Sequence, residues 1–246
     1  MSDVIDIIFP EQGISLVAGP TGAGKTRWLL ETMLKWQRGE DVLGYRSHYR
    51  PWLYVSGDRS QHEARGTISD LGICIADIPL FPAFGLVPPI GALGILEAAE
   101  KLKVELLVWE GFGSYVESQW GSTKIKSWLN FITWRLTHTH DGKERFAPLT
   151  IIGVMEQPKM KPRDTYANPR QRISGPAAWG HTAASVVLVE HEDPKCRGPY
   201  RRLTVCPHQR GGDMEFRASL ETGHFVILER VEDVASTEDY LKGIGE

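Results

Sequence analysis

The residues with the most informative spacing form a glycine-rich stretch near the start of the chain, which satisfies the pattern G-x-x-x-x-G-K-[ST] of phosphate-binding loops. Glycine permits the backbone angles and the close approach that let a turn direct its N–H groups at a phosphate. The helix that follows directs the positive end of its dipole at the same anion. In this pattern the lysine contacts the β- and γ-phosphates of a nucleotide, and the adjoining hydroxyl binds Mg²⁺. The sequence therefore predicts a site for ATP and Mg²⁺ formed by Gly19, Pro20, Thr21, Gly22, Ala23, Gly24, Lys25 and Thr26.

Two acidic residues follow apolar runs and could complete a hydrolytic site. Hydrolysis of ATP needs a carboxylate near the metal and a group that orients the attacking water. Glu110 ends the apolar run 106–109, where it is predicted either to hold Mg²⁺, through water, or to orient the attacking water. Asp58 follows the run 52–55, and ligands of open α/β sheets lie at such carboxyl ends of strands. A solvated strand-end glutamate and a turn aspartate are the plainer interpretations, and Glu63 is a weaker candidate on the outer face of the next helix.

These residues require a particular set of elements around them. Short apolar runs alternate with segments of helical spacing, which is typical of a mostly parallel sheet covered by helices on both faces. We expect an α/β domain over residues 1–230, closed by a C-terminal β extension, and an acidic tail over residues 231–246. Strands are expected at 14–18, 52–55, 73–78, 104–109, 149–155, 183–190, 201–205 and 224–228, and helices at 26–38, 61–71, 91–102 and 124–138.

Composition excludes several classes of protein. The net charge of −3 gives no overall attraction to nucleic acid, so any such binding needs a local basic patch. Three cysteines without a C-x-x-C pair argue against a disulfide framework. A zinc site from His191, Cys196, Cys206 and His208 has unusual spacing and is disfavoured. The sequence has neither a signal peptide nor a membrane-spanning stretch, so we expect a cytoplasmic protein.

The order of these parts resembles a RecA-like ATPase, in particular the hexameric replicative helicases and their single-domain relatives. The stretch 10–26 resembles their entry strand and phosphate loop, 56–60 the segment of their catalytic acid, and 106–112 their metal-binding strand. The stretch 154–157 resembles the strand that ends in a polar sensor, which implies that role for Gln157. The stretch 203–212 resembles a strand ending in K-x-R-x-G, which implies that Arg210 reaches the ATP of a neighbouring subunit. Asp58 in place of glutamate, Glu110 in place of aspartate and His208 in place of lysine depart from the family pattern, which indicates slow or partner-dependent hydrolysis.

The resemblance also implies two loops that face the centre of a ring or filament. The loop 158–172 carries five basic residues against Asp164, which could neutralise phosphates, while Tyr166 could stack on a base. The loop 111–123 adds Tyr115 and Trp120. A solvated basic loop is the alternative interpretation. The residues predicted to contact nucleic acid are Lys159, Lys161, Arg163, Tyr166, Arg170 and Arg172.

Two functions from different classes remain open at this point. One is a motor or recombination ATPase that forms a homo-oligomeric ring or filament and couples ATP hydrolysis to single-stranded DNA or RNA. The other is a nucleotide-gated switch or scaffold that assembles and recruits a protein partner with little turnover. A small-molecule kinase is less favoured, because no arginine-rich lid follows an acceptor pocket and the sensor and finger segments would have no role.

Overall fold

The structure is a computed structural model, and it describes residues 5, 8–85, 90–115, 122–145, 147–156, 179, 182–193, 195, 197–207, 212–221 and 223–231. In the described part of the chain, strands alternate with helices as far as residue 156, and the strands between residues 185 and 231 follow one another directly. The strands are β1 (Ile14–Gly19), β2 (Trp52–Ser56), β3 (Leu80–Pro82), β4 (Leu106–Glu110), β5 (Thr150–Glu156), β6 (Ser185–His191), β7 (Tyr200–Pro207), β8 (Met214–Ser219) and β9 (Val226–Val231). The α-helices are α1 (Lys25–Gln37), α2 (Gln61–Asp70), α3 (Ile90–Lys101) and α4 (Ser122–Thr137), and short 3₁₀ helices are η1 (Ile75–Asp77) and η2 (Phe112–Tyr115).

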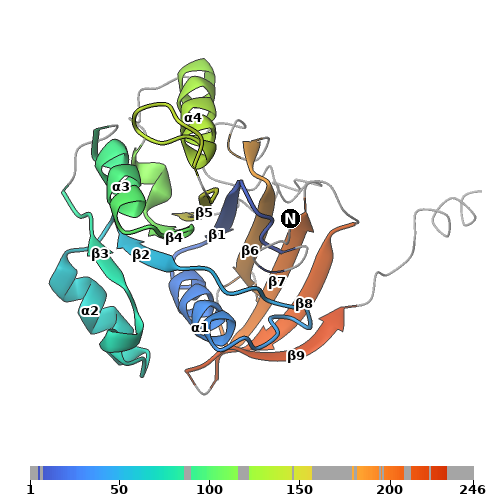
Figure 1. Cartoon of the computed structure of the whole chain (residues 1–246). Helices are drawn as coiled ribbons and strands as arrows, with labels where there is room; N and C mark the ends of the chain where they lie inside the picture. Colours follow the sequence, from blue (N-terminus) through green and yellow to red (C-terminus); the bar gives the residue numbers. More distant parts are fainter. Residues whose placement is uncertain are drawn as a thin grey trace, which may run out of the picture.

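All nine of these strands form one sheet in the order β3-β2-β4-β5-β1-β6-β7-β8-β9. The strands from β3 to β6 run parallel to one another, while β7, β8 and β9 extend the sheet as an antiparallel meander (Figure 1). The mostly parallel α/β fold with a C-terminal β extension is therefore confirmed. Because β1 lies between β5 and β6, the loop that follows β1 has strand ends on both sides.

Helices cover the two faces of the sheet in pairs (Figure 1). One core cluster joins α1 and α2 to sheet residues such as Val17, Val108 and Val154. The other joins α3 and α4 to residues such as Leu16 and Leu107. Side chains of adjacent strand residues point to opposite faces, so apolar runs of this kind are buried from both sides. The same alternation determines which strand-end side chains point toward the helix after the phosphate loop.

One expected strand is absent, and two strands of the structure, β3 and β8, were not expected. The segment 73–78 forms no strand, because only its end residues Ile73 and Ile78 are buried while Ile75–Asp77 turns outward as η1. The third strand of the parallel set is instead β3, where Leu80 pairs with Tyr54. The strand β8 was not predicted at all. The tail predicted over residues 231–246 lies outside the described residues beyond the end of β9.

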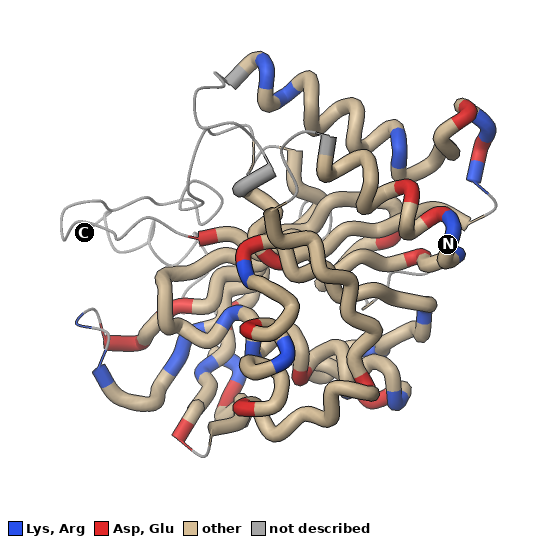
Figure 2. Tube along the Cα trace, turned by 90° about the vertical axis from the view of Figure 1, so that its left-hand side faces the viewer, with Lys and Arg blue, Asp and Glu red and all other residues tan. Residues whose placement is uncertain are grey.

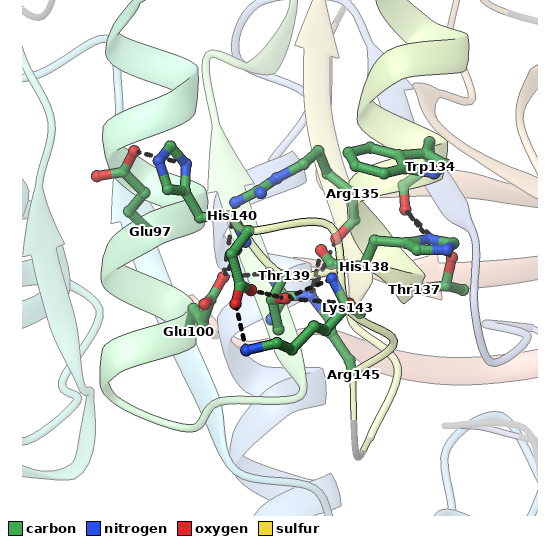
Figure 3. Close-up of polar contacts among 11 residues, drawn as sticks. Glu97, Glu100, Trp134, Arg135, Thr137, His138, Thr139, His140, Lys143 and Arg145 are labelled. Atoms are coloured by element: carbon green, nitrogen blue, oxygen red, sulfur yellow. Dashed lines mark hydrogen bonds and ion pairs between the residues drawn. The ribbon is translucent and has the colours of Figure 1, made fainter.

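An ionic cluster of one partly exposed glutamate and two buried arginines joins α3 to the end of α4, near the amino ends of the parallel strands. The carboxylate of Glu100 lies 3.6 Å from the guanidinium of Arg135 and 3.5 Å from that of Arg145, and it accepts a hydrogen bond from the backbone of His140 (Figure 3). Arg145 also donates to the backbone carbonyl of Arg135. The Arg135 side chain is only 3% exposed and that of Arg145 only 7%. The Glu100 carboxylate therefore neutralises two buried arginines, which in turn hold the connection between α4 and β5 in place. Among the described helices, none is long and apolar enough to span a membrane.

Candidate nucleotide site

The phosphate loop leaves the carboxyl end of β1 in tight contact with the neighbouring strand. A Cβ added to Gly19 would lie 2.0 Å from the carbonyl oxygen of Val189 in β6, so only glycine fits at this position. Gly22 and Gly24 have φ angles of +81° and +95°. Residues with a Cβ adopt such angles at a steric cost. The loop thus depends on glycine for its packing at the start and for its backbone turn in the middle.

The N-terminus of α1 is open, in contrast to that of α2. Gly24 is the N-cap of α1, it has no side chain to cap the helix, and no acidic residue lies in the first turn. In α2 the hydroxyl of Ser60 accepts from the backbone of Glu63, whose carboxylate accepts from the backbone of Ser60 in return. This use of Glu63 as an exposed helix cap gives the residue a structural role. The free N–H groups and the dipole of α1 favour an anion at the phosphate loop.

Lys25 belongs to the first turn of α1 and folds back over the loop. Its ammonium donates to the carbonyl oxygens of Gly19, at 2.9 Å, and Pro20, at 3.1 Å. Burial lowers the pKa of Lys25, while the carboxylates of Glu156 and Glu110 oppose that shift. The lysine is therefore positioned above the loop backbone with acidic groups close by.

Glu110 is the most buried of the acidic residues at this edge of the sheet, with 2% exposure. It points toward α1 because it continues the row of Val108, which packs in the same cluster as α1. The hydroxyls of Thr26 and Tyr54 each donate to one of its carboxylate oxygens at 2.5 Å. Arg59 lies 3.5 Å from the oxygen that Thr26 contacts. Burial and the charge of Glu110 raise the pKa of Tyr54 well above its usual range, so Tyr54 stays a protonated donor.

Asp58 lies beside Glu110 because their strands are neighbours. Ser56 in β2 pairs with Glu110 in β4, and the backbone N–H of Gly57 donates to the Glu110 carbonyl at 3.1 Å. A Cβ added to Gly111 would lie 3.0 Å from the Cβ of Asp58. Asp58 is exposed as a residue, but loss of water around its carboxyl group and the negative charge of Glu110 raise its pKa to about 6. Two carboxyl groups with different environments therefore lie side by side, and that of Glu110 accepts from the Thr26 hydroxyl.

Three residues of this site were not predicted from the sequence: Tyr54, Arg59 and Glu156. Glu156 is the last residue of β5, and its carboxylate accepts from the Thr21 hydroxyl at 2.9 Å. Strand alternation could have indicated Glu156, because it continues the row of Val154 on the α1 face. Tyr54 needs the pairing of β2 with β4 to be known, which the sequence does not give.

Several predicted residues lie outside the described part of the chain. These are the sensor candidate Gln157, the finger candidate Arg210, the loop residues Trp120, Lys159, Lys161, Arg163, Tyr166, Arg170 and Arg172, and the zinc candidates Cys196 and His208. For Tyr115 only the backbone is described, at the end of η2. In the described trace, basic and acidic residues are interspersed (Figure 2). The case for a basic nucleic-acid surface therefore depends on the sequence of the loop 158–172.

The described zinc candidates do not come together. His191 pairs with Arg201 at one end of the β6–β7 ladder, whereas Cys206 pairs with Val186 near the other end. Five residues of extended strand separate the two positions, which is about 16 Å. Among the described residues, no group of three or more metal-ligating side chains gathers. Burial and the nearby charge of Arg201 lower the pKa of His191.

Comparisons with known proteins agree with this geometry. A family model described as an AAA domain matches residues 1–101, which include the phosphate loop. The fold is similar to that of a KaiC-like protein from the hyperthermophilic archaeon Pyrococcus horikoshii, with a TM-score of 0.63 and 15% sequence identity over 92% of this chain and 94% of that chain. No curated protein matches the sequence. The resemblance to the RecA-like P-loop ATPases is thereby confirmed, and it supports an ATPase at the level of this broad class.

Proposed function

We propose that this chain binds Mg·ATP at residues 19–26, hydrolyses it, and couples hydrolysis to single-stranded nucleic acid within a homo-oligomer. The observation that carries the ATPase part is the contact between Glu110 and Thr26, which lies in the first turn of α1 beside its uncapped N-terminus. A hydroxyl and a carboxylate are ligands that Mg²⁺ prefers, and the helix end beside them favours phosphate. The site thus combines groups for a hard cation and for a polyphosphate.

The chemistry of the donor set fits a magnesium-bound nucleotide. Two cations, Lys25 and Arg59, lie among three carboxyl groups, those of Asp58, Glu110 and Glu156. Acidic charge in excess of basic charge favours a divalent cation, and the bound metal supplies charge neutralisation for the phosphates. In this proposal Thr26 and Glu110 hold Mg²⁺, Glu110 through water, and Lys25 contacts the β- and γ-phosphates.

Asp58 is our candidate for the residue that orients the attacking water. Asp58 is exposed, so water can reach it, whereas Glu110 is buried and accepts from two hydroxyl groups. A raised pKa is typical of a carboxyl group that accepts a proton during a reaction. The departure from glutamate to the shorter aspartate favours slow hydrolysis. Gln157, one residue beyond Glu156, is proposed as the sensor of the γ-phosphate.

The proposed role of Arg210 requires a second copy of the chain. Pro207, three residues before Arg210, pairs with Ser185 at the amino end of β6. The phosphate loop follows the opposite, carboxyl end of the neighbouring strand β1. We therefore propose that Arg210, which follows Pro207 in the sequence, serves the nucleotide of a neighbouring copy. This arrangement supports a ring or filament in which Arg210 neutralises transition-state charge on the ATP of the next subunit.

Coupling to single-stranded DNA or RNA is proposed from the basic loop 158–172. The test is steady-state ATPase activity of the full chain with and without single-stranded DNA or RNA, across a salt series. We expect stimulation of several-fold, and binding that weakens steeply as salt rises because counterions are released. Changing Lys159, Lys161 and Arg163 to glutamine should reduce that binding and leave basal activity unchanged.

The matched control changes Lys101, Lys103 and Lys143, three exposed basic residues remote from the site, to glutamine. Unchanged affinity of the loop variant would remove nucleic acid from the proposal. Nucleotide-dependent assembly without any stimulation would favour the switch or scaffold instead.

A further inference from the structure

Arg201, a buried residue of the antiparallel extension, donates a hydrogen bond to the backbone of the phosphate loop. Arg201 is the second residue of β7 and is 6% exposed. Its Nε donates to the carbonyl oxygen of Ala23 at 2.9 Å, and its Nη1 donates to those of Gly198 and Tyr200, both at 2.9 Å. A hydrogen bond from a guanidinium is stronger than one between neutral groups. Arg201 thus links two segments that are 178 residues apart in sequence.

The contacted carbonyl belongs to the same peptide unit as the N–H of Gly24. In a planar trans peptide the C=O and the N–H point in opposite directions. Arg201 holds the Ala23 oxygen on the side of β7, so the Gly24 N–H points away from β7. Within the described part of the chain this N–H donates no hydrogen bond. The N–H of Ala23, in contrast, donates to the carbonyl oxygen of Pro20. The Gly24 N–H is therefore available to an anion at the start of α1.

The same peptide is supported from the turn between β8 and β9. A Cβ added to Gly24 would lie 3.0 Å from the ring of Phe225 and 3.4 Å from Leu220, so this turn packs directly on the helix start. Glu31 of α1 accepts hydrogen bonds from the backbone of Phe225 and from the His224 ring, both at 2.9 Å. The antiparallel extension therefore encloses the outer side of the phosphate loop.

We propose that Arg201 is a positioning residue for nucleotide: it fixes the Ala23–Gly24 peptide so that the Gly24 N–H is directed at a phosphate oxygen. The polarised carbonyl also makes the attached N–H a better donor. This inference rests on the proposed function only in that the loop 19–26 binds a nucleoside di- or triphosphate. It assigns part of the phosphate affinity to a strand outside the phosphate-loop motif.

The first test measures Mg·ADP and Mg·ATP affinity by calorimetry at low temperature, together with the melting temperature of the nucleotide-free protein. Arg201→Met keeps most of the packing volume and removes the donor, and we expect affinity to fall about tenfold, the equivalent of one hydrogen bond to a charged group. Arg201→Lys keeps a charged donor and should restore affinity to within about threefold of the wild type. The matched control is Arg202→Met on the same strand, where Arg202 is exposed and pairs with Glu215. This control should bind nucleotide as the wild type does.

The second test uses the wild-type chain and so does not depend on a variant that folds. Only two Ala–Gly pairs occur in the sequence, Ala18–Gly19 and Ala23–Gly24. Labelling alanine carbonyls with ¹³C and glycine amides with ¹⁵N therefore isolates the two amide signals of Gly19 and Gly24. We expect Mg·ADP to move the Gly24 amide proton downfield, and the Gly19 signal shows separately how the start of the loop responds. In Arg201→Met the same shift should be smaller.

The outcomes separate this inference from the proposed function. If the wild type fails to bind Mg·ADP, both the proposed function and the positioning role of Arg201 are wrong. If the wild type binds but Arg201→Met binds equally tightly, or the Gly24 signal of the wild type does not move, Arg201 has no positioning role. A lower melting temperature with unchanged affinity has the same meaning, because it shows that Arg201 supports the fold alone.

Discussion

At the scale of single residues, the site depends on two carboxyl groups with different surroundings. Glu110 is buried and accepts hydrogen bonds from two hydroxyl groups, and the exposed Asp58 lies beside it. The raised pKa of Asp58, about 6, follows from this neighbourhood. Environments that differ in this way are how proteins assign separate roles to two acids. The proposed division of labour can therefore be tested by neutralising each acid in turn.

Asp58→Asn should preserve ATP affinity and stop hydrolysis, because the amide cannot accept a proton from the attacking water. Glu110→Gln should instead weaken the Mg²⁺ dependence of nucleotide binding. Equilibrium binding titrations at several Mg²⁺ concentrations, with phosphate release measured in parallel, check both. The exposed Glu63 at the start of α2 provides the control variant Glu63→Gln. The opposite pattern, with Glu110→Gln stopping hydrolysis at unchanged affinity, would exchange the two assignments.

Asp58 also has a predictable effect on stability in metal-free, nucleotide-free protein. Its pKa is higher in the folded chain, at about 6, than the ordinary value of 3.8. The folded state therefore binds the proton more tightly than the unfolded state, and the contribution of Asp58 to stability is fully present below about pH 3.8 and is lost as pH rises through about 6.

Asn mimics the protonated form at every pH. Asp58→Asn should therefore be more stable than the wild type at pH 7.5, and this advantage should disappear near pH 4. Urea unfolding at a series of pH values measures the difference. A stability difference that does not change with pH would show that Asp58 is not perturbed in the folded state.

At the scale of elements, local patterns predicted the phosphate loop and most helices and strands. Strand β1, the glycine turn and α1 follow one another directly in the sequence, so a local pattern of residues is enough to predict how they are connected. The unpredicted strand β8 alternates buried Met214, Phe216 and Ala218 with more exposed residues, a signal that was present in the sequence. The run 73–78 is apolar enough to suggest a strand, but nothing local shows that only its two ends are buried.

The parts of the site that could not be predicted depend on contacts between distant segments. Arg201 contacts the backbone carbonyl of Ala23. Every residue has such a carbonyl, so the residue type at position 23 does not indicate this contact. Arg59 reaches Glu110 only because β2 and β4 are neighbours in the sheet. Sequence spacing therefore identifies groups that share a loop or a strand end, and sheet order decides which of these groups meet.

The ionic cluster between α3 and α4 gives a stability prediction at this scale. Glu100→Gln leaves two buried arginines, Arg135 and Arg145, without their shared carboxylate. We expect a loss of about 2 kcal/mol in the free energy of unfolding, less than for a fully buried pair because Glu100 is partly exposed. Denaturant unfolding measures it. Glu97→Gln on the same helix, where Glu97 pairs with the exposed His140, is the control and should change stability by less than about 0.5 kcal/mol. Equal losses for both variants would contradict a special role for Glu100.

At the scale of the whole molecule, the sheet separates the phosphate loop from the strand end that precedes Arg210. If Arg210 acts on the ATP of a second copy, two inactive variants should complement one another. Lys25→Ala removes a site's own lysine, and Arg210→Ala removes the arginine given to a neighbour.

Mixing the two variant chains should recover part of the wild-type ATPase activity, because some sites then combine an intact Lys25 with an intact Arg210. Steady-state ATPase assays across mixing ratios measure this recovery, with each variant alone as control. A mixture as inactive as its components would place both residues in one chain's site, or remove Arg210 from the mechanism.

The most direct test of the central claim is the binding of Mg·ADP and Mg·ATP to the wild-type chain, to Lys25→Ala and to Lys35→Ala, measured by isothermal titration calorimetry. Lys25 lies at the first turn of α1 over the phosphate loop, whereas Lys35 lies in the last turn of the same helix. We predict that Lys25→Ala weakens binding at least about 100-fold, since contacts between charged groups and two phosphates are lost, and that Lys35→Ala binds as the wild type does. Equal affinity of the wild type and Lys25→Ala would contradict the account.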